Sequence, residues 1–459
     1  MKGKVSLLIL MSAFIGLTSC NDFVELDTAK TRIVRSKVFE DDAGARAAIS
    51  GILSQMMVIS SFASGSVNSL TIVAGLSSDE FLNHTSSQNF VTLYNNTLTP
   101  INNGAVTNNW NDMYLVIYEA NSILEGCQNS TSLSPKVQNQ VIGEAKFLRA
   151  FAYFYLINLF GDVPLVTGTD YRVNKSLPRT PMAEVYEQIE SDLLDAQTLL
   201  LTDYSMSMGE RVEPNRWACT ALLARAYLYQ KKWAQAEAQS AEIIANQMFS
   251  LPEPNSAFLA NSEEAIWQLM PVFPGTNTNE AQQLIFTGTP TRISLRPSVI
   301  DVFELNDARR NSWLKTITVG GKTYAHVFKY KVRLQGQPLT EYYTVFRLAE
   351  QYLIRSEARA MQNNLTGAIA DINVLRSRAQ LDPIDGSGMT QQEVLSAIER
   401  ERRCELFAEW GHRWFDLKRS GNIDAILGPV KSDWQSKDAL YPIPQAEIVA
   451  NPNIVQNPQ

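Results

Sequence analysis

Apolar residues recur at intervals of three or four along most of this chain, which predicts a mainly helical fold. Plausible capping residues stand at many of the expected helix ends. The predicted helices lie near 40–58, 108–126, 136–160, 181–201, 214–230, 233–248, 342–362, 365–380 and 390–418.

The last predicted helix carries an apolar stripe among charges of both signs. The stripe consists of Leu406, Trp410, Trp414 and Leu417, spaced by four, four and three residues. This spacing places all four on one side of a helix if the helix is continuous. Arginines and carboxylates surround the stripe within helical reach, so we expect ion pairs that hold this segment against a larger helical body.

Two predicted helix pairs share one spacing of small and bulky residues. A small residue lets two helices approach closely, and a bulky residue seven positions later fills the next gap, as in tetratricopeptide-like hairpins. The two pairs are not a tandem array, and ordinary packing of alanine-rich helices also accounts for the pattern. The positions are Ala226, Trp233 and Ala236 in the first pair, and Ala358, Leu365 and Ala368 in the second.

Two stretches lack helical periodicity, at about 60–107 and 250–340. The first is rich in Ser, Asn and Thr, and the second contains recurrent proline. Within the second, apolar positions flank Gly320-Gly321 and predict a β-hairpin that includes Tyr324. We expect both stretches to form loops over a helical scaffold, where binding residues usually lie.

The N-terminus has the features of an export signal. Lys2 and Lys4 precede an apolar run that is too short to span a bilayer comfortably. The run ends in Leu-Thr-Ser-Cys, which resembles a bacterial lipobox, so Cys20 is the predicted lipidation site; an ordinary secretory signal is the alternative. No later stretch reaches the ~18 apolar residues of a membrane helix. We therefore expect a signal peptide at 1–19, a lipidated tether at 20–35 and a single body at 36–459 that is anchored to the membrane by lipid.

Composition and charge narrow the class of protein. The chain has 459 residues, 45% of them hydrophobic, which suffices for a large core. Its net charge is −7 and no run of Lys or Arg interrupts the acidic balance, so a nucleic-acid partner is disfavoured. The cysteines beyond Cys20 match no metal motif and no disulfide framework, and we expect Cys219 and Cys404 to be buried thiols.

The sequence offers little for catalysis. The three histidines, His84, His326 and His412, show no metal-ligand spacing. Glu405 and Glu409 form the nearest pair of carboxylates, but neighbouring arginines favour an ion-pair network over the acid–base pair of a glycosidase. No phosphate-binding glycine loop or G-x-S-x-G elbow is present. We therefore predict no catalytic residue, no metal and no cofactor.

The irregular stretches contain the side chains that carbohydrate binding requires. Sugar rings lie against aromatic planes, and their hydroxyl groups need amide or charged partners. For each aromatic residue taken alone, packing in the core beneath a loop is the competing interpretation. The candidate ligand-binding residues are Phe81, Tyr94, Asn96, Phe273, Trp313 and Tyr324.

Five strings, in this order, resemble the SusD/RagB family of Bacteroidetes surface lipoproteins. They span both ends and the middle of the mature chain, and the ordered set is far more specific than any one string. The strings are WNDMYLVIYEANSIL (110–124), EAKFLRAFAYFYLINLFGDVPLV (144–166), FRLAEQYLIRSEA (346–358), ERRCELFAEWGHRWFDLKRSG (401–421) and LYPIPQAEIVANPNIVQNP (440–458).

The resemblance implies an α-dominated fold: a tetratricopeptide-like helical scaffold of four units with loop-rich insertions and a few short strands. It further implies a surface-exposed outer-membrane lipoprotein that binds oligosaccharide and passes it to a SusC-like TonB-dependent transporter. A peptide-binding member of the same family, a surface scaffold or adaptor without a nutrient site, and a lipoprotein glycoside hydrolase remain alternatives. Residues matching family positions, for which the resemblance implies a structural role, are Arg149, Gly161, Pro164, Glu357, Arg403, Glu405, Arg413 and Asp416.

Overall fold

The computed structural model describes residues 35–458 and is dominated by helices. The predicted signal peptide and lipidation site, Cys20, lie outside the described residues. The helices are α2 (Arg35–Val38), α3 (Asp42–Val58), α4 (Leu70–Ser77), α5 (Gln88–Asn95), α6 (Gly104–Gln128), α7 (Pro135–Phe160), α8 (Tyr171–Asn174), α9 (Met182–Leu199), α10 (Arg216–Tyr229), α11 (Trp233–Ile244), α12 (Asn279–Leu284), α13 (Pro297–Asp301), α14 (Ala308–Trp313), α15 (Leu348–Met361), α16 (Leu365–Arg378), α17 (Gln391–Leu406), α18 (His412–Arg419), α19 (Ile423–Leu427) and α20 (Gln445–Ala450). The strands are β1 (Phe81–Asn83), β2 (Ala265–Leu269), β3 (Ile293–Leu295), β4 (Leu314–Val319), β5 (Lys322–Val327) and β6 (Tyr343–Arg347).

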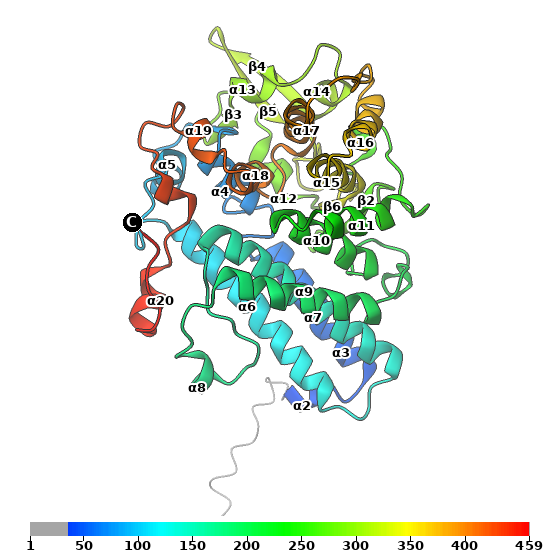
Figure 1. Cartoon of the computed structure of the whole chain (residues 1–459). Coiled ribbons are helices and arrows are strands. Elements are labelled where there is room, and N and C mark those ends of the chain that lie inside the picture. The colour runs from blue at the N-terminus through cyan, green and yellow to red at the C-terminus, as the bar shows by residue number, and fades with distance from the viewer. Residues whose placement is uncertain (1–34, 459) are drawn as a thin grey trace, which may run out of the picture.

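Long helices form the scaffold (Figure 1), as the periodicity predicted. α7 packs between α6 and α9, and nearly all of its second half is buried. The chain leaves α7 at Gly161, whose φ of 75° ends the helix in a conformation that favours glycine. Among residues 35–458, no helix has both the length and the apolar character needed to cross a membrane.

The two predicted helix pairs are confirmed as hairpins. α10 packs on α11 and α15 packs on α16, and α11 also packs on α15, so the hairpins stack on each other. The alanines of the shared spacing, Ala226, Ala236, Ala358 and Ala368, are fully buried. Small side chains at these contacts allow the close helix approach on which such stacks depend.

The described strands form three two-stranded antiparallel sheets, β1–β3, β2–β6 and β4–β5. The predicted hairpin is β4–β5, which turns at Gly320 and Gly321 with φ angles of 58° and 79°. The predicted helix at 342–362 is wrong in its first turn, because Tyr343–Arg347 pairs with β2 as strand β6. The β-branched and aromatic side chains of this segment suit a fully buried strand.

The prediction of a continuous helix at 390–418 is also wrong. The chain breaks between α17 and α18, where Ala408, Trp410 and Gly411 have φ angles of 51°, 46° and 74°. The break lets the Trp410 indole stack on Tyr343, with ring centroids 4.9 Å apart, and donate its Nε1 hydrogen to the Thr344 carbonyl oxygen. Tertiary packing therefore overrides the helical spacing.

The stretch at 60–107 contains loops, as was predicted, but loops make up only part of it. It contains α4, in which every residue from Leu70 to Ser77 is buried. A helix buried on all sides has no polar face, so its sequence lacks the periodicity that identifies helices at a surface. Cys127, Cys219 and Cys404 are also buried and carry free thiols, which confirms the prediction for Cys219 and Cys404.

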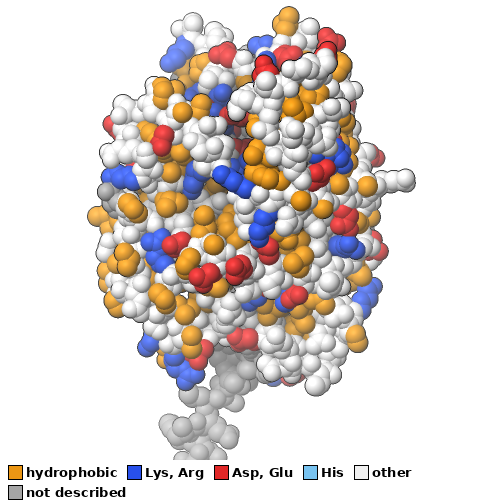
Figure 2. Space-filling model, in the orientation of Figure 1, with side chains coloured by type: hydrophobic (Ala, Val, Ile, Leu, Met, Phe, Trp, Pro, Cys, Tyr) orange, Lys and Arg blue, Asp and Glu red, His pale blue; other side chains and the backbone are white. Residues whose placement is uncertain are grey.

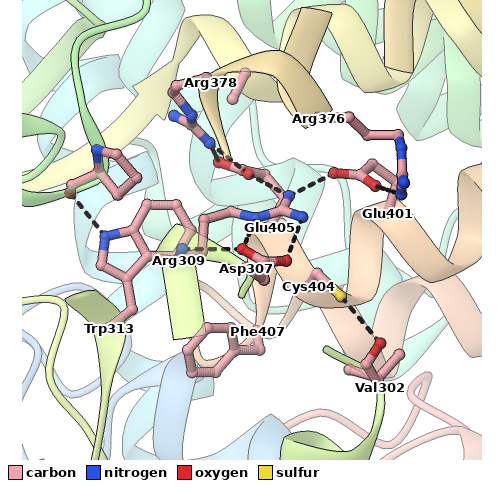
Figure 3. Close-up of polar contacts among 12 residues, drawn as sticks. Val302, Asp307, Arg309, Trp313, Arg376, Arg378, Glu401, Cys404, Glu405 and Phe407 are labelled. Carbon is pink, nitrogen blue, oxygen red and sulfur yellow. Dashed lines mark hydrogen bonds and ion pairs between the residues drawn. The ribbon is translucent and has the colours of Figure 1, made fainter. Parts of the chain in front are cut away.

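Basic, acidic and apolar side chains are intermixed over the face of the described residues drawn in Figure 2, with no large area of one charge sign. Inside the molecule, by contrast, charges are concentrated. Glu405, which is fully buried, accepts hydrogen bonds from Arg309 and Arg378 at 3.0 and 2.5 Å (Figure 3). It also accepts a hydrogen bond from Arg347 at 2.5 Å. Burial raises the pKa of the Glu405 carboxyl, but the three arginines lower it well below its usual range. We call these four residues the Glu405 cluster.

The other family-matching residues also join separate parts of the scaffold. Arg149 of α7 pairs with Asp192 of α9, and Glu357 of α15 pairs with Arg419 of α18. Asp416 accepts from Arg402 and Arg419, and Asp79 accepts from both Arg403 and Arg413. The Pro164 carbonyl accepts a hydrogen bond from Tyr114. These contacts place charged side chains between segments of the scaffold and fix the positions of those segments relative to one another.

Replacing Glu405 tests the importance of the cluster. Glu405→Gln removes one charge among three buried arginines, and loss of one partner from a buried ion pair costs about 3–5 kcal/mol. We expect the free energy of unfolding, measured by urea denaturation, to fall by about that amount. The control is Glu242→Gln, which breaks a pair with Arg216 whose side chains are 38% and 36% exposed and which we expect to cost less than about 1 kcal/mol. Equal costs for the two variants would contradict a special role for the buried cluster.

Candidate functional site

Aromatic side chains gather at strand β5 and the segments beside it. Tyr324 and His326 lie two positions apart in β5, and Phe328 follows two positions after His326. Because successive side chains of a strand point to opposite faces, these three project toward the same side. The His84 ring lies 5.7 Å from Tyr324, Phe286 lies 4.9 Å from His326, and Phe328 lies 6.0 Å from His326, measured between centroids. We call His84, Phe286, Tyr324, His326 and Phe328 the aromatic row.

Short strands position the row. His84 directly follows β1; its backbone N–H donates to the Arg292 carbonyl at 2.7 Å, and its ring Nε2 lies 2.7 Å from the Ser294 hydroxyl oxygen. β3 pairs with β1 and also lies against β5, so the two sheets adjoin. The Phe328 N–H donates to the Trp313 carbonyl at 2.7 Å, which fixes the end of the hairpin on α14.

The row combines accessible ring surface with polar neighbours. His84, Phe286, Tyr324 and Phe328 are partly exposed, whereas His326 is 6% exposed. The Lys322 ammonium lies 5.1 Å from the centre of the Tyr324 ring. Ring faces beside hydroxyl, imidazole and ammonium groups match the apolar C–H faces and hydroxyl groups of a sugar.

The surroundings of His84 favour its neutral form. Burial lowers the pKa of its imidazole, and the positive charge of Lys322 lowers that pKa further. A neutral imidazole has one donor and one acceptor nitrogen. One of these nitrogens, Nε2, is already paired with the Ser294 hydroxyl group.

Two residues that were predicted to bind ligand belong to the core. Phe81 is 1% exposed, within β1, and Trp313 is fully buried with its indole donating to the Pro254 carbonyl at 2.7 Å. The Trp313 ring packs against the cationic groups of Lys329, Arg347 and Arg378. These side chains support the hairpin from within and offer no surface to a ligand.

The other predicted residues lie in different settings. Tyr324 is in the aromatic row. Phe273 is 59% exposed and lies in a loop that forms a backbone hydrogen bond with the segment at 331–341. The cationic groups of Arg296 and Lys431 lie 5.2 and 5.3 Å from the centre of the Tyr94 ring. Asn96 is 2% exposed, and its side chain donates to the Ser77 carbonyl beside a cavity of about 250 Å³.

The structure adds His84, Phe286, His326 and Phe328 to the site. His84 and His326 were considered as metal ligands alone, and the two phenylalanines were not selected. The alternation of Tyr324, His326 and Phe328 through a predicted hairpin strand is visible in the sequence and could have identified one side of the row. The contributions of His84 and Phe286 depend on long-range packing.

Comparison with known proteins places this architecture among SusD-like proteins. Residues 38–228 match a family model described as starch-binding associating with outer membrane, and residues 315–459 match one described as SusD family. SusD-like protein P2 of Formosa agariphila is 26% identical, covering 99% of both chains. The starch-binding protein SusD of Bacteroides thetaiotaomicron is 23% identical, over 68% of this chain and 72% of its own.

Solved structures share the fold. A SusD superfamily protein from Bacteroides vulgatus has a TM-score of 0.77 at 22% identity, covering 91% of this chain and 98% of its own. A laminarin-binding SusD-like protein has a TM-score of 0.75 at 24% identity, covering 91% and 99%. At these identities the likeness concerns the fold.

Several buried carboxyl groups hold protons at neutral pH, a property that general acids also have. Burial raises the pKa of Glu80 to about 7 and those of Glu144 and Glu280 to about 8. Each is at most 3% exposed, and Glu280 accepts a hydrogen bond from the Tyr343 hydroxyl at 2.8 Å. Glu144 and Glu280 lie in the protein interior, and Glu80 belongs to the lining of a pocket beside α17 and α18. Within residues 35–458, no cluster of three His, Cys, Asp or Glu side chains suits a metal ion.

The raised pKa of Glu280 predicts a specific pH dependence of stability. Unfolding returns Glu280 to its ordinary pKa near 4.5, so between that pH and about 8 the folded state holds a proton that the unfolded state has lost. The contribution of this group to stability is therefore complete below pH 4.5 and is lost as the pH rises to about 8. We expect Glu280→Gln to remove up to about 1.4 kcal/mol per pH unit from the slope of unfolding free energy across this range. Denaturant titrations from pH 5 to about 8 measure the slope, and an unchanged slope would show that Glu280 is ionised in the fold.

Proposed function

Because this chain belongs to the SusD/RagB family, we propose that it is a cell-surface lipoprotein that captures an oligosaccharide and passes it to a SusC-like TonB-dependent outer-membrane transporter. One of the matching family models is described as starch-binding associating with outer membrane. Two similar proteins are named for starch and laminarin binding. These relatives support a glucan or related glycan as the first class of ligand to test.

The aromatic row is the observation that carries the proposal. Four of its five rings are partly exposed, all but that of His326, so consecutive sugar units have several apolar faces to contact. The β4–β5 hairpin of the row is tied to α14 and adjoins the β1–β3 sheet, so the geometry of the row is set before ligand arrives. A preorganised site loses less conformational entropy on binding.

We propose binding without catalysis. A glycosidase needs two carboxyl groups on either side of the scissile bond. The side chains of Glu80, Glu144 and Glu280 are buried, and Glu405 and Glu409 are held by arginines. Ligand therefore leaves the row unchanged, and delivery to the transporter follows from release.

Attachment to the outer membrane is proposed to depend on Cys20. Each lipid chain contributes about 0.8 kcal/mol for every buried CH₂ group, so several chains on one residue give firm anchorage. The acylated cysteine then holds the body at the cell exterior, where it caps the transporter. Hinged closure of the body over the pore would enclose the ligand.

Truncating Tyr324 tests the glycan site. Tyr324→Ala removes a partly exposed ring from the row, and we expect glycan affinity to fall by at least about ten-fold, equivalent to about 1.4 kcal/mol. Calorimetry with a panel of α-glucan, β-glucan and other oligosaccharides identifies the ligand and measures the change. Tyr118→Ala is the matched control, because it removes a 50% exposed tyrosine from α6. Binding that is equally strong in both variants would exclude the row, turnover of a glycan would favour a hydrolase, and saturable binding of peptides alone would favour the peptide-binding alternative.

Replacing Cys20 tests the anchor. Cys20→Ala removes the thiol that would carry the lipid, so we expect the protein to leave the outer-membrane fraction while its glycan affinity is unchanged. Intact mass of the native protein should show an acylated first residue, and protease added to whole cells should digest it. A native protein with an unmodified terminus, or one protected from protease in intact cells, would refute surface anchorage.

A further inference from the structure

A groove of about 330 Å³ lies between α17 and α18, separate from the aromatic row. The turn between α10 and α11, with Lys231 and Trp233, and the end of α15, with Glu357 and Met361, complete its lining. Figure 2 shows a hollow in the upper part of the molecule, bordered by basic and apolar side chains. The volume is at the lower end of the range of about 300–1,000 Å³ that is usual for small-molecule sites.

The floor of the groove contains buried hydrogen-bonding atoms without a protein partner. Arg402 is 4% exposed; its Nε and Nη2 atoms donate to Asp416 at 3.0 Å, and its Nη1 has no acceptor among the described residues. His412 is also 4% exposed, and its Nδ1 has no partner there. The same holds for Nε of Arg403. A buried polar group without a partner costs about 1–3 kcal/mol, so three such groups around one cavity indicate a site that accepts ligand oxygen atoms.

The charges around the groove favour a ligand with a single negative charge. Each arginine of the lining is paired with a carboxylate, yet Arg402 and Arg403 keep unused donor nitrogens that point to an anionic acceptor. Lys231 adds a positive charge at the exposed rim. Asp416, Glu357 and Glu399 in the same lining would repel a second negative charge on the ligand. A carboxylate fits these conditions better than a dianionic phosphate.

The residues of the walls and the rim indicate what kind of molecule the carboxylate group of the ligand belongs to. Trp233, Leu395 and Phe407 give the walls an apolar character, which suits the C–H faces of a sugar ring. Gln392, Ser396, Ser420 and Asn422 supply amide and hydroxyl groups at the exposed rim, which suits ring hydroxyls.

We propose that this groove is a second binding site, which takes a small sugar acid of about one ring, with its carboxylate on Arg402 and His412. The floor supplies donors to the carboxylate, the walls contact the ring, and the rim binds hydroxyl groups. The site is independent of the aromatic row, so it stands even if the row binds no glycan.

Glucuronate and galacturonate are the probes, with glucose as the neutral comparison and inorganic phosphate as the competing anion. Calorimetry and ligand-observed NMR on the folded chain should show saturable binding of at least one uronate and none of glucose. We expect Ser396→Trp, an exposed position on the rim, to weaken uronate binding at least ten-fold by filling the groove. Arg402→Gln should have a similar effect, and Asp416 keeps Arg419 as a partner at 2.8 Å in this variant.

Ser377→Trp is the matched control, because it places the same bulky ring at an exposed serine on α16, outside the groove lining. Uronate affinity should be unchanged in this control and in Tyr324→Ala, and circular dichroism should show all variants folded. Absence of binding by both uronates, equal binding of glucose, binding of phosphate alone, or unchanged affinity in Ser396→Trp would each overturn the proposal.

Discussion

The convergence of Arg309, Arg347 and Arg378 on one buried carboxylate is the constraint on which the rest of the fold depends. These arginines come from α14, from the end of β6 and from α16, three segments far apart in the chain, while Glu405 comes from α17. Taking a charge out of water is costly unless partners replace the water, so no one of these segments can move away alone. The Glu405 cluster thereby joins the irregular region to the stacked helical hairpins.

Trp313 connects the Glu405 cluster to the hairpin at the surface. The indole packs against the cations of Arg347 and Arg378, and the next residue begins β4 of the hairpin that carries Tyr324. The Trp313 carbonyl accepts the Phe328 N–H, so both ends of the hairpin are tied to α14. A buried ion cluster and a buried indole thus fix the position of a partly exposed aromatic row. A residue that was predicted to contact ligand supports the site from inside.

The sequence predicts those elements that have one face in the core and the other in solvent, because their apolar and polar residues then alternate with a regular spacing. Helices with a polar face, the β4–β5 hairpin and the small residues of the stacked hairpins were all recoverable from spacing. The buried helix α4 was missed because it has no polar face, and the break before Gly411 was missed because it depends on packing around Trp410. Tyr324 was predicted because it lies in the β4–β5 hairpin, which the spacing of residues reveals. His84 and Phe286 were missed because they contact β5 from segments that are distant in sequence.

Helix α17 contributes to the support of both proposed binding surfaces. Glu401 and Glu405 lie one turn apart and face Arg309, whereas Arg402 and Leu406 lie on an adjacent side and line the groove. A ligand in the groove could affect the aromatic row by shifting α17, and any such shift would separate opposite charges in a medium of low polarity. The Glu405 cluster, which positions the aromatic row, therefore also opposes any movement of α17 by which binding at one site could change the affinity of the other. Because the cost of moving α17 is large compared with the coupling free energies of about 1–3 kcal/mol that are typical between sites, the two sites are expected to bind independently.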